Sequence, residues 1–198
     1  MAEPLKNSFG ADVPRTIARM IAAVFPRFDE PAFVRSVLDG YDALELMPRG
    51  RKIAQELRRF MPDDYEKAVE ILLASLDRKP ERTVAQGMGG FLFLPHVFFV
   101  ADYGLDHFEA SMRAQYVLTQ RFTAEFAIRP FIVRHPARVF AILESWLDDP
   151  SAHVRRLVSE GSRPRLPWGM QLKPLIADPS PTLPLLRALQ DDPSEYVR

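Results

Sequence analysis

The second half of the chain contains a carboxylate surrounded by cations. Glu160 lies in the stretch HVRRLVSEGSRPRLPW, which runs from His153 to Trp168 and also holds four arginines. Arginine side chains bind anions such as phosphates, and a carboxylate beside them can act as a general base or as a counter-charge for a developing cation. These residue types predict a site that combines anion binding with acid–base or electrostatic chemistry.

A second carboxylate, Glu125 in the run RFTAEFAIRP, follows Leu118 by seven residues and Phe122 by three. That spacing places it on an apolar helix stripe, where a carboxylate is costly unless it is paired or used. The paired alternative is a structural ladder in which Arg121 and Arg129, four residues before and after, flank it. In the functional alternative, the two glutamates face one groove from neighbouring repeats.

A helix expected at residues 151–161 positions Glu160 at its exposed end, where Gly161 would close the helix in a left-handed conformation. Successive helical residues turn by about 100°, which separates an apolar face from a polar one. The apolar face holds Val154, Leu157 and Val158, and the polar face holds His153, Arg156 and Glu160. The structural alternative for Arg156 and Glu160 is a surface ion pair worth about 0.3–0.5 kcal/mol. Trp168 has no periodic pattern around it and is equally compatible with a place in the core.

Charge is distributed unevenly along the chain. The whole chain carries 26 basic and 26 acidic residues, whereas residues 121–173 carry nine basic and five acidic ones. Overall neutrality excludes a globally basic nucleic-acid binder, but the local excess predicts an anionic partner for this region. The chain has no cysteine, and its four histidines lack the spacing of metal ligands, so no metal or other cofactor is expected.

Apolar residues recur at helical spacing, as at Ile17, Met20, Ile21 and Val24, and no alternation typical of strands appears. Eighteen prolines divide this pattern into short helices. The most apolar segment, residues 91–100, has about half the length that a membrane-spanning helix needs, and it is therefore expected to be a buried helix start. Because the N-terminus also lacks a secretory signal, the sequence predicts an all-α, cytoplasmic protein.

An internal repeat refines the architecture. DDPSAHVR at residues 148–155 returns as DDPSEYVR at residues 191–198, which is a spacing of 43 residues. A period in the forties with two helices per unit is typical of HEAT-like repeats. In each copy an aspartate is expected to cap a helix that begins with proline. Within one unit, residues 136–147 are expected to form the outer helix and residues 151–161 the inner one.

Repeats of this kind form curved α-solenoids whose concave face binds extended partners. We therefore expect a single HEAT-like domain over residues 1–198 with a basic concave face. Because the last repeat unit breaks off at Arg198, we also expect these residues to belong to a longer protein, truncated here at the C-terminus.

The runs TAEFAIRPFI, HVRRLVSEGSRPRLPW and DPSEYVR together resemble the AlkC family of bacterial DNA alkylation-repair glycosylases, which are relatives of AlkD with HEAT-like repeats. The resemblance extends to PLKNSFG, FPRFDEPAF and LELMPRGRKIAQELRRFMP, and so covers essentially the whole chain. It implies a DNA glycosylase that excises cationic alkylated bases, above all 3-methyladenine, from double-stranded DNA in base excision repair. It also implies action on bent DNA without enclosing the base. A monomer is the default for a solenoid that clamps a duplex.

By this resemblance, the catalytic residues are Glu125, Glu160 and Trp168. The residues implied to bind DNA are Arg121, Arg129, His153, Arg155, Arg156, Ser162, Arg163 and Arg165. The family continues after DPSEYVR into further repeats that supply another acidic residue and more DNA contacts, so one alternative for the 198-residue chain alone is weak DNA binding without activity. The alternative is a non-catalytic HEAT-like scaffold that binds DNA or protein through its concave face. Glutamates fully engaged by arginines favour the scaffold, and carboxylates free to face an open groove favour the enzyme.

Overall fold

The computed structural model describes residues 5–77 and 89–198, and within these ranges every regular element is a helix. The α-helices are α1 (Asp12–Ala22), α2 (Glu30–Leu38), α3 (Leu46–Phe60), α4 (Tyr65–Ser75), α5 (Leu94–Tyr103), α6 (Phe108–Thr119), α7 (Glu125–Arg134), α8 (Pro136–Ser145), α9 (Ala152–Gly161), α10 (Lys173–Ala177) and α11 (Leu183–Leu189). Short 3-10 helices are η1 (Leu5–Ser8), η2 (Tyr41–Ala43), η3 (Gly89–Phe93) and η4 (Ser180–Thr182). The predicted all-α class is confirmed.

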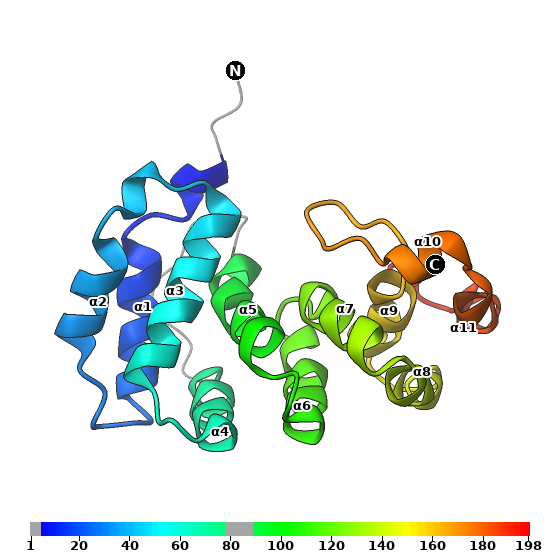
Figure 1. The fold of residues 1–198 in the computed structure, drawn as a ribbon, viewed down its shortest axis with the longest axis horizontal. Helices are drawn as coiled ribbons and strands as arrows, with labels where there is room; N and C mark the ends of the chain where they lie inside the picture. Colours follow the sequence, from blue (N-terminus) through cyan, green and yellow to red (C-terminus); the bar gives the residue numbers. More distant parts are fainter. Residues whose placement is uncertain (1–4, 78–88) are drawn as a thin grey trace.

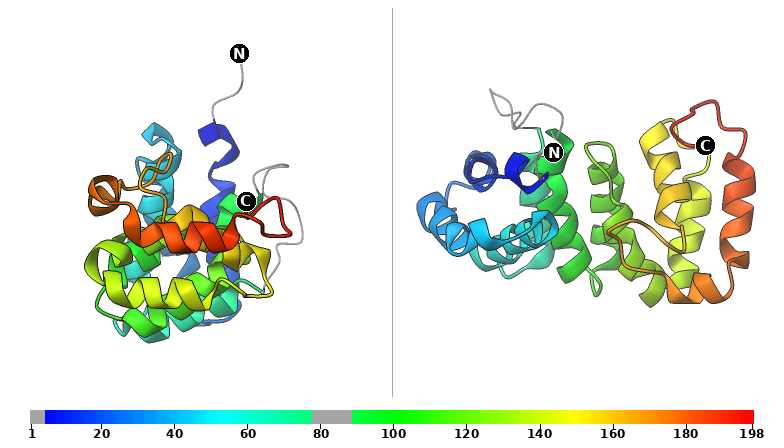
Figure 2. Two further views of the ribbon diagram at one scale, coloured as in Figure 1. Left: turned by 90° about the vertical axis from the view of Figure 1, so that its right-hand side faces the viewer. Right: turned by 90° about the horizontal axis from the view of Figure 1, so that it is seen from above.

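The helices form two rows that follow the chain from one end of the molecule to the other (Figure 1). Helices α3, α5, α7 and α9 pack successively against one another, and α11 packs on α9. Helices α4, α6 and α8 lie along the lower side in Figure 1, and Figure 2 shows the same succession of helices from two further directions. The helix of residues 136–147 and the helix of residues 151–161 thus fall into different rows, as expected for the two members of a repeat.

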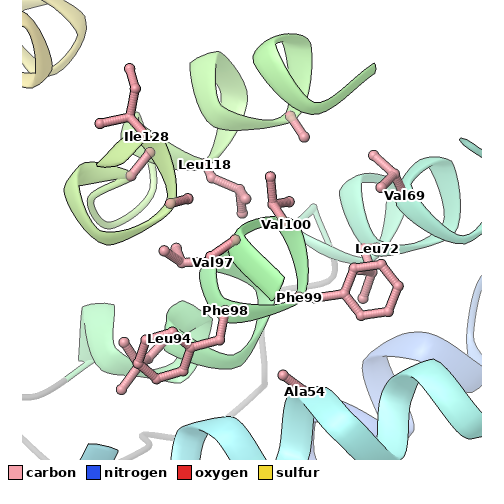
Figure 3. Close-up of a cluster of buried hydrophobic side chains, with 14 of the residues drawn as sticks. Ala54, Val69, Leu72, Leu94, Val97, Phe98, Phe99, Val100, Leu118 and Ile128 are labelled. Atoms are coloured by element: carbon pink, nitrogen blue, oxygen red, sulfur yellow. The ribbon is translucent and has the colours of Figure 1, made fainter. Parts of the chain in front are cut away.

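Helix α5 lies at the centre of the hydrophobic core. All its residues from Leu94 to Ala101 are buried, and its phenylalanines reach toward α3 and α4 (Figure 3). Pro95 lies in the first turn, where its missing N–H costs no helical hydrogen bond. The prediction of a buried helix start in this apolar segment is confirmed. Within the described residues, no helix is both long enough and apolar enough to span a membrane.

The two Asp-Pro-Ser copies adopt the same local structure. Asp149 Oδ1 accepts a hydrogen bond from Ser151 N at 2.8 Å, and Asp192 Oδ1 accepts one from Ser194 N at 2.8 Å. Each aspartate therefore closes a turn over its own proline. The expectation that proline is the first helical residue is wrong for both copies, because α9 begins at Ala152, two residues after Pro150, and residues 191–198 form turns instead of a helix.

The arginine that ends each copy reinforces this turn and links the repeats. Arg155 Nη1 donates to Asp149 O at 2.6 Å, and Arg198 Nη1 donates in the same way to Asp192 O. Arg155 also forms an ion pair with the Asp192 carboxylate at 2.7 Å. The arginine of the first copy thus holds the aspartate of the second.

Gly161 does not have the left-handed conformation expected of it. It is the last residue of α9, and among the described residues only Gly40 and Trp168 have a positive φ. A Cβ at Gly161 would lie 2.9 Å from Ile128 Cγ2 on α7. Glycine is therefore required here by the close approach of α9 to α7, and this approach brings the two candidate carboxylates together.

Candidate functional site

Glu125 is the first residue of α7, and it does not continue the helix that contains Leu118. Helix α6 ends at Thr119, so the apolar stripe inferred from the spacing of Leu118 and Glu125 is interrupted by a helix break. The backbone N–H of Glu125 donates a hydrogen bond to Thr123 Oγ1 at 3.3 Å. A carboxylate at this position is stabilised by the unpaired N–H groups and the dipole of the helix N-terminus.

One arginine joins the two glutamates. Arg156 on α9 donates through Nη1 to Glu125 Oε2 at 2.9 Å, and its Nη2 lies 3.9 Å from Glu160 Oε1. Arg163 Nη1 donates to the same Glu160 oxygen at 2.5 Å. We call Glu125, Arg156 and Glu160 the carboxylate cluster. The predicted proximity of the two glutamates, on neighbouring helices, is present in the structure.

The carboxylate cluster is largely shielded from solvent. The side chains of Glu125, Arg156 and Glu160 are 12%, 23% and 21% exposed. Glu160 is therefore not at a fully exposed helix end, because the loop that follows α9 turns back beside it and brings Arg163 onto its carboxylate. Partial burial lowers the local dielectric constant and strengthens every charge interaction in the cluster.

The predicted ladder of Arg121, Glu125 and Arg129 does not form. Arg121 pairs instead with Asp77 at 3.1 Å, and Arg129 points into the protein interior. In the part of the chain that the structure describes, no hydrogen bond is donated to Glu125 Oε1 or to Glu160 Oε2. Each carboxylate is therefore half engaged, and each keeps one oxygen for a further partner.

Trp168 lies on the surface, in the segment between α9 and α10, and not in the core. Its side chain is 61% exposed and its backbone has a φ of 62°. The segment, residues 162–172, projects from the row of helices as a loop (Figure 1). Buried Leu166 and Leu172 anchor it, while Arg163 and Arg165 are exposed beside the tryptophan. The loop presents an aromatic ring and two cations outward.

Tyr196 also adjoins the carboxylate cluster, and it was not expected there. The Arg156 guanidinium lies over its ring, 4.8 Å from the ring centroid, and His153 meets the ring edge to face at 5.4 Å. His153 itself is exposed. Tyr196 occupies the position in DDPSEYVR that His153 occupies in DDPSAHVR, so the repeat alignment was a signal that could have found it.

Three residues expected to bind DNA are engaged within the protein itself. Arg129 is fully buried and donates to four backbone carbonyls. Ser162 is fully buried and donates to Val158 O at 2.7 Å. Arg155 is committed to Asp192, and that hydrogen bond raises the pKa of its guanidinium. All three act within the fold.

The remaining expected DNA-binding residues are accessible. Arg121, His153, Arg163 and Arg165 are exposed, and Arg156 is partly so. The described residues contain no group of three or more histidine and carboxylate side chains that could hold a metal ion. The site therefore offers two carboxylates, an aromatic ring and several cations.

No family model matches the chain, but a curated protein and a solved structure are similar to it. An uncharacterized protein, YhaZ of Bacillus subtilis (strain 168), is 37% identical over 195 residues, which cover 98% of this chain and 52% of that protein. The structure of the Pseudomonas fluorescens alkylpurine DNA glycosylase AlkC, bound to DNA containing an abasic site analogue, matches with a TM-score of 0.89 and 37% identity. The chain is similar to AlkC along almost its whole length. The match covers 99% of this chain and 52% of AlkC, so the chain spans about half the length of both relatives.

Because the match to AlkC covers 99% of the chain, it spans the region from α1 to α11 in which the carboxylate cluster, the loop of residues 162–172 and both Asp-Pro-Ser turns lie. The resemblance seen in the sequence is thereby confirmed along the chain. The AlkC-like helical repeat explains how glutamates 35 residues apart meet, because α7 and α9 are adjacent members of one row.

Proposed function

We propose that the chain forms the substrate-binding and catalytic part of a DNA glycosylase that releases cationic alkylated bases, above all 3-methyladenine, from double-stranded DNA. The observation that carries the proposal is the carboxylate cluster, in which Glu125 and Glu160 flank Arg156 in a chain 37% identical to AlkC. The proposal includes the cytoplasmic location and the single HEAT-like domain expected from the sequence.

The chemistry of the substrate fits two carboxylates. Methylation at N3 makes the base a cation, so its bond to the sugar is already weak and the leaving base needs little protonation. Breaking this bond develops oxocarbenium character on the sugar, as in glycoside hydrolysis. A carboxylate held beside the sugar stabilises that positive charge, and the second can orient or deprotonate the attacking water. Glu125 Oε1 and Glu160 Oε2 supply the free oxygens for these two roles.

The arginines of the site hold the carboxylates until a competing anion arrives. Arg156 and Arg163 offset the charges of Glu125 and Glu160 in the chain without DNA. A DNA phosphate is an equally good partner for a guanidinium. We propose that phosphates of the bound duplex draw at least the exposed Arg163 away from Glu160, so that the negative field of the cluster increases as the lesion arrives.

The loop of residues 162–172 is the second part of the proposed site. Trp168 offers an exposed ring for stacking on a base or sugar, and Arg163 and Arg165 offer cations for the backbone. Such phosphate contacts carry no sequence information, as is required of a protein that must find a lesion in any sequence. Binding should therefore weaken steeply as salt is added.

The test is release of 3-methyladenine from alkylated duplex DNA, measured for this chain and for a longer version that carries the second half found in its relatives. Release by both versions, or by the longer one alone, supports the proposal. DNA binding without release by either version would leave the non-catalytic scaffold as the better description. In that case Glu125 and Glu160 would be partners of Arg156 and Arg163 and nothing more.

A further inference from the structure

Arg129 is the largest fully buried side chain in the described residues, and its charge is held by backbone carbonyls alone. Its Nη1 donates to Gly161 O at 3.1 Å and to Arg163 O at 2.8 Å, its Nη2 donates to Pro164 O at 3.2 Å, and its Nε donates to Met170 O. All four carbonyls belong to the end of α9 and the loop after it. One residue of α7 therefore binds the loop at both of its ends.

The loop has few other backbone contacts to fix its shape. Leu172 N donates to Pro164 O at 3.0 Å, and Gly169 N donates to Leu166 O at 3.1 Å. Between these bonds Trp168 has a φ of 62°, a left-handed conformation that is unfavourable for a residue with a Cβ. Such a conformation persists only where the surroundings determine it. The carbonyls on either side of Trp168, at Pro164 and Met170, are those that Arg129 holds.

A guanidinium is suited to this task in a way that other side chains are not. It stays protonated, it has five N–H donors in one plane, and it can face several carbonyls at once. Burial lowers the pKa of Arg129, and the nearby carboxylates of Glu125 and Glu160 act in the opposite direction. Removing a charge from water is costly, so a buried arginine without a bidentate carboxylate partner indicates that its carbonyl contacts are needed.

We propose that Arg129 is a positioning residue. Its guanidinium fixes the loop of residues 162–172 in one shape before DNA binds, and through the loop it places Trp168 against the DNA and Arg163 against Glu160. This inference rests on the proposed glycosylase function for its consequence in activity, but the effect on the loop is independent of that function. The loop is thus a preformed element whose ordering cost is met in folding rather than in binding.

The chain contains a matched control for Arg129. Arg49 on α3 is also buried, and its guanidinium donates only to backbone carbonyls. These carbonyls are those of Leu44, Lys6, Phe9 and Asp42, at distances of 2.7–3.1 Å. They lie at the opposite end of the row of helices from the loop (Figure 1). Replacing either arginine by lysine removes the planar set of donors and keeps the charge.

The experiment compares Arg129→Lys with Arg49→Lys in a Trp146→Phe background, where Trp168 is the remaining tryptophan. Helical content and Tm report the fold, acrylamide quenching and fluorescence anisotropy report the order of Trp168, and affinity for duplex DNA and single-turnover release of 3-methyladenine report function. We expect both variants to lower Tm. Only Arg129→Lys should make the Trp168 indole more mobile, weaken DNA binding and slow release by about tenfold or more, as a misplaced binding group does.

Each other outcome counts against the proposal. Unchanged Trp168 mobility in Arg129→Lys would overturn it, as would mobile Trp168 with unchanged DNA affinity. Equal loss of affinity in folded Arg49→Lys would show that the effect is general. If Arg129→Lys does not fold, Arg129→Gln is measured in its place. If neither Arg129 variant folds while Arg49→Lys does, Arg129 is required for the stability of the whole row of helices and the proposal is overturned. If neither the parent chain nor its longer version releases base, the proposed function fails, and Trp168 mobility with DNA affinity still decides the role of Arg129.

Discussion

Arg156 Nη1 on α9 lies 2.9 Å from Glu125 Oε2 at the start of α7, although 31 residues separate the two in the sequence. The pair joins adjacent helices of one row and turns a single oxygen of Glu125 toward the arginine. The other oxygen accepts no hydrogen bond from the described residues. The same contact that orders the carboxylate therefore leaves it able to act on a substrate.

Replacing either glutamate of the carboxylate cluster by glutamine should abolish most of the activity. Glu125→Gln and Glu160→Gln keep the shape of the side chain and remove its charge, so single-turnover release of 3-methyladenine should slow by about 10²–10³-fold with little change in DNA affinity. Glu70→Gln, at an exposed carboxylate on α4, is the matched control and should behave as the parent. Parent-like release by Glu160→Gln would remove this residue from the mechanism.

Trp168→Ala should lower the affinity for duplex DNA without lowering the stability of the fold. The ring is 61% exposed, so its loss should leave Tm almost unchanged, while duplex affinity should fall by about 1–3 kcal/mol if the ring stacks on a base. Trp146→Ala provides the contrast, because Trp146 packs on the Tyr116 ring at 5.7 Å and supports the fold. This variant should lower Tm and leave affinity per folded molecule intact. The reverse pattern in the two variants would contradict the assigned roles.

The ion pair between Arg155 and Asp192 should matter more than other ion pairs of the chain. Asp192→Ala leaves a largely buried guanidinium without its carboxylate, so we expect the free energy of unfolding to fall by about 1–3 kcal/mol in urea titration. Glu109→Ala removes the partner of Arg138 from a pair that is half exposed, and should cost less than about 1 kcal/mol. Similar losses in both variants would show that burial does not distinguish the pairs.

The contribution of Asp192 to the free energy of unfolding should be lost at acid pH. The hydrogen bond from Arg155 holds the pKa of this carboxyl below its usual value. Because the folded-state pKa is depressed, the contribution is present in full above the unfolded pKa of about 3.9 and is lost as pH falls through the folded pKa. The difference in unfolding free energy between the parent and Asp192→Asn should therefore be constant from neutral pH to about pH 5 and shrink below pH 4. A difference that grows in acid would be incompatible with the ion pair.

Burial of His96 should make the protein lose stability at a higher pH than the ion pair of Asp192 does. It is fully buried on α5, its Nδ1 has no hydrogen-bond partner among the described residues, and burial lowers its pKa from 6.5 to about 4. Between pH 6.5 and 4, His96 is protonated in the unfolded chain but stays neutral in the folded one. The free energy of unfolding should therefore fall by about 3 kcal/mol as pH drops from 6.5 toward 4. His96→Leu should flatten this slope in equilibrium unfolding, whereas His107→Gln, at an exposed histidine, should retain it. A slope that survives in His96→Leu would place its origin elsewhere.

The sequence predicted those features that depend on short-range pattern. Helical spacing gave the all-α class, and the repetition of DDPSAHVR as DDPSEYVR gave the repeat, because the Asp-Pro-Ser turn is a local structure in which Asp149 bonds the backbone two residues on. The two glutamates were predicted to be close from the resemblance to AlkC and from the repeat, since equivalent faces of adjacent repeats meet.

Features that depend on distant partners were predicted less well. Counting seven residues from Leu118 to Glu125 assumed one continuous helix, and spacing alone does not reveal the break after Thr119. Arg129 was expected to bind DNA by the resemblance, or to pair with Glu125 four residues away, whereas its partners are backbone carbonyls of residues 161–170, which no sequence pattern marks. Gly161 was predicted to be a left-handed helix cap, whereas glycine is needed there because the side chain of Ile128 leaves no room for a Cβ.

The way in which Arg129 holds the loop has a consequence for evolution and for engineering. Its hydrogen bonds end on carbonyl oxygens, so they are indifferent to the side chains that the loop carries at Arg163, Arg165 and Trp168. Those side chains can change without loss of the scaffold that presents them. A library randomised at these three positions, with Arg129 kept, would sample new surface chemistries on one fixed backbone, and this makes the loop the natural place to redirect specificity.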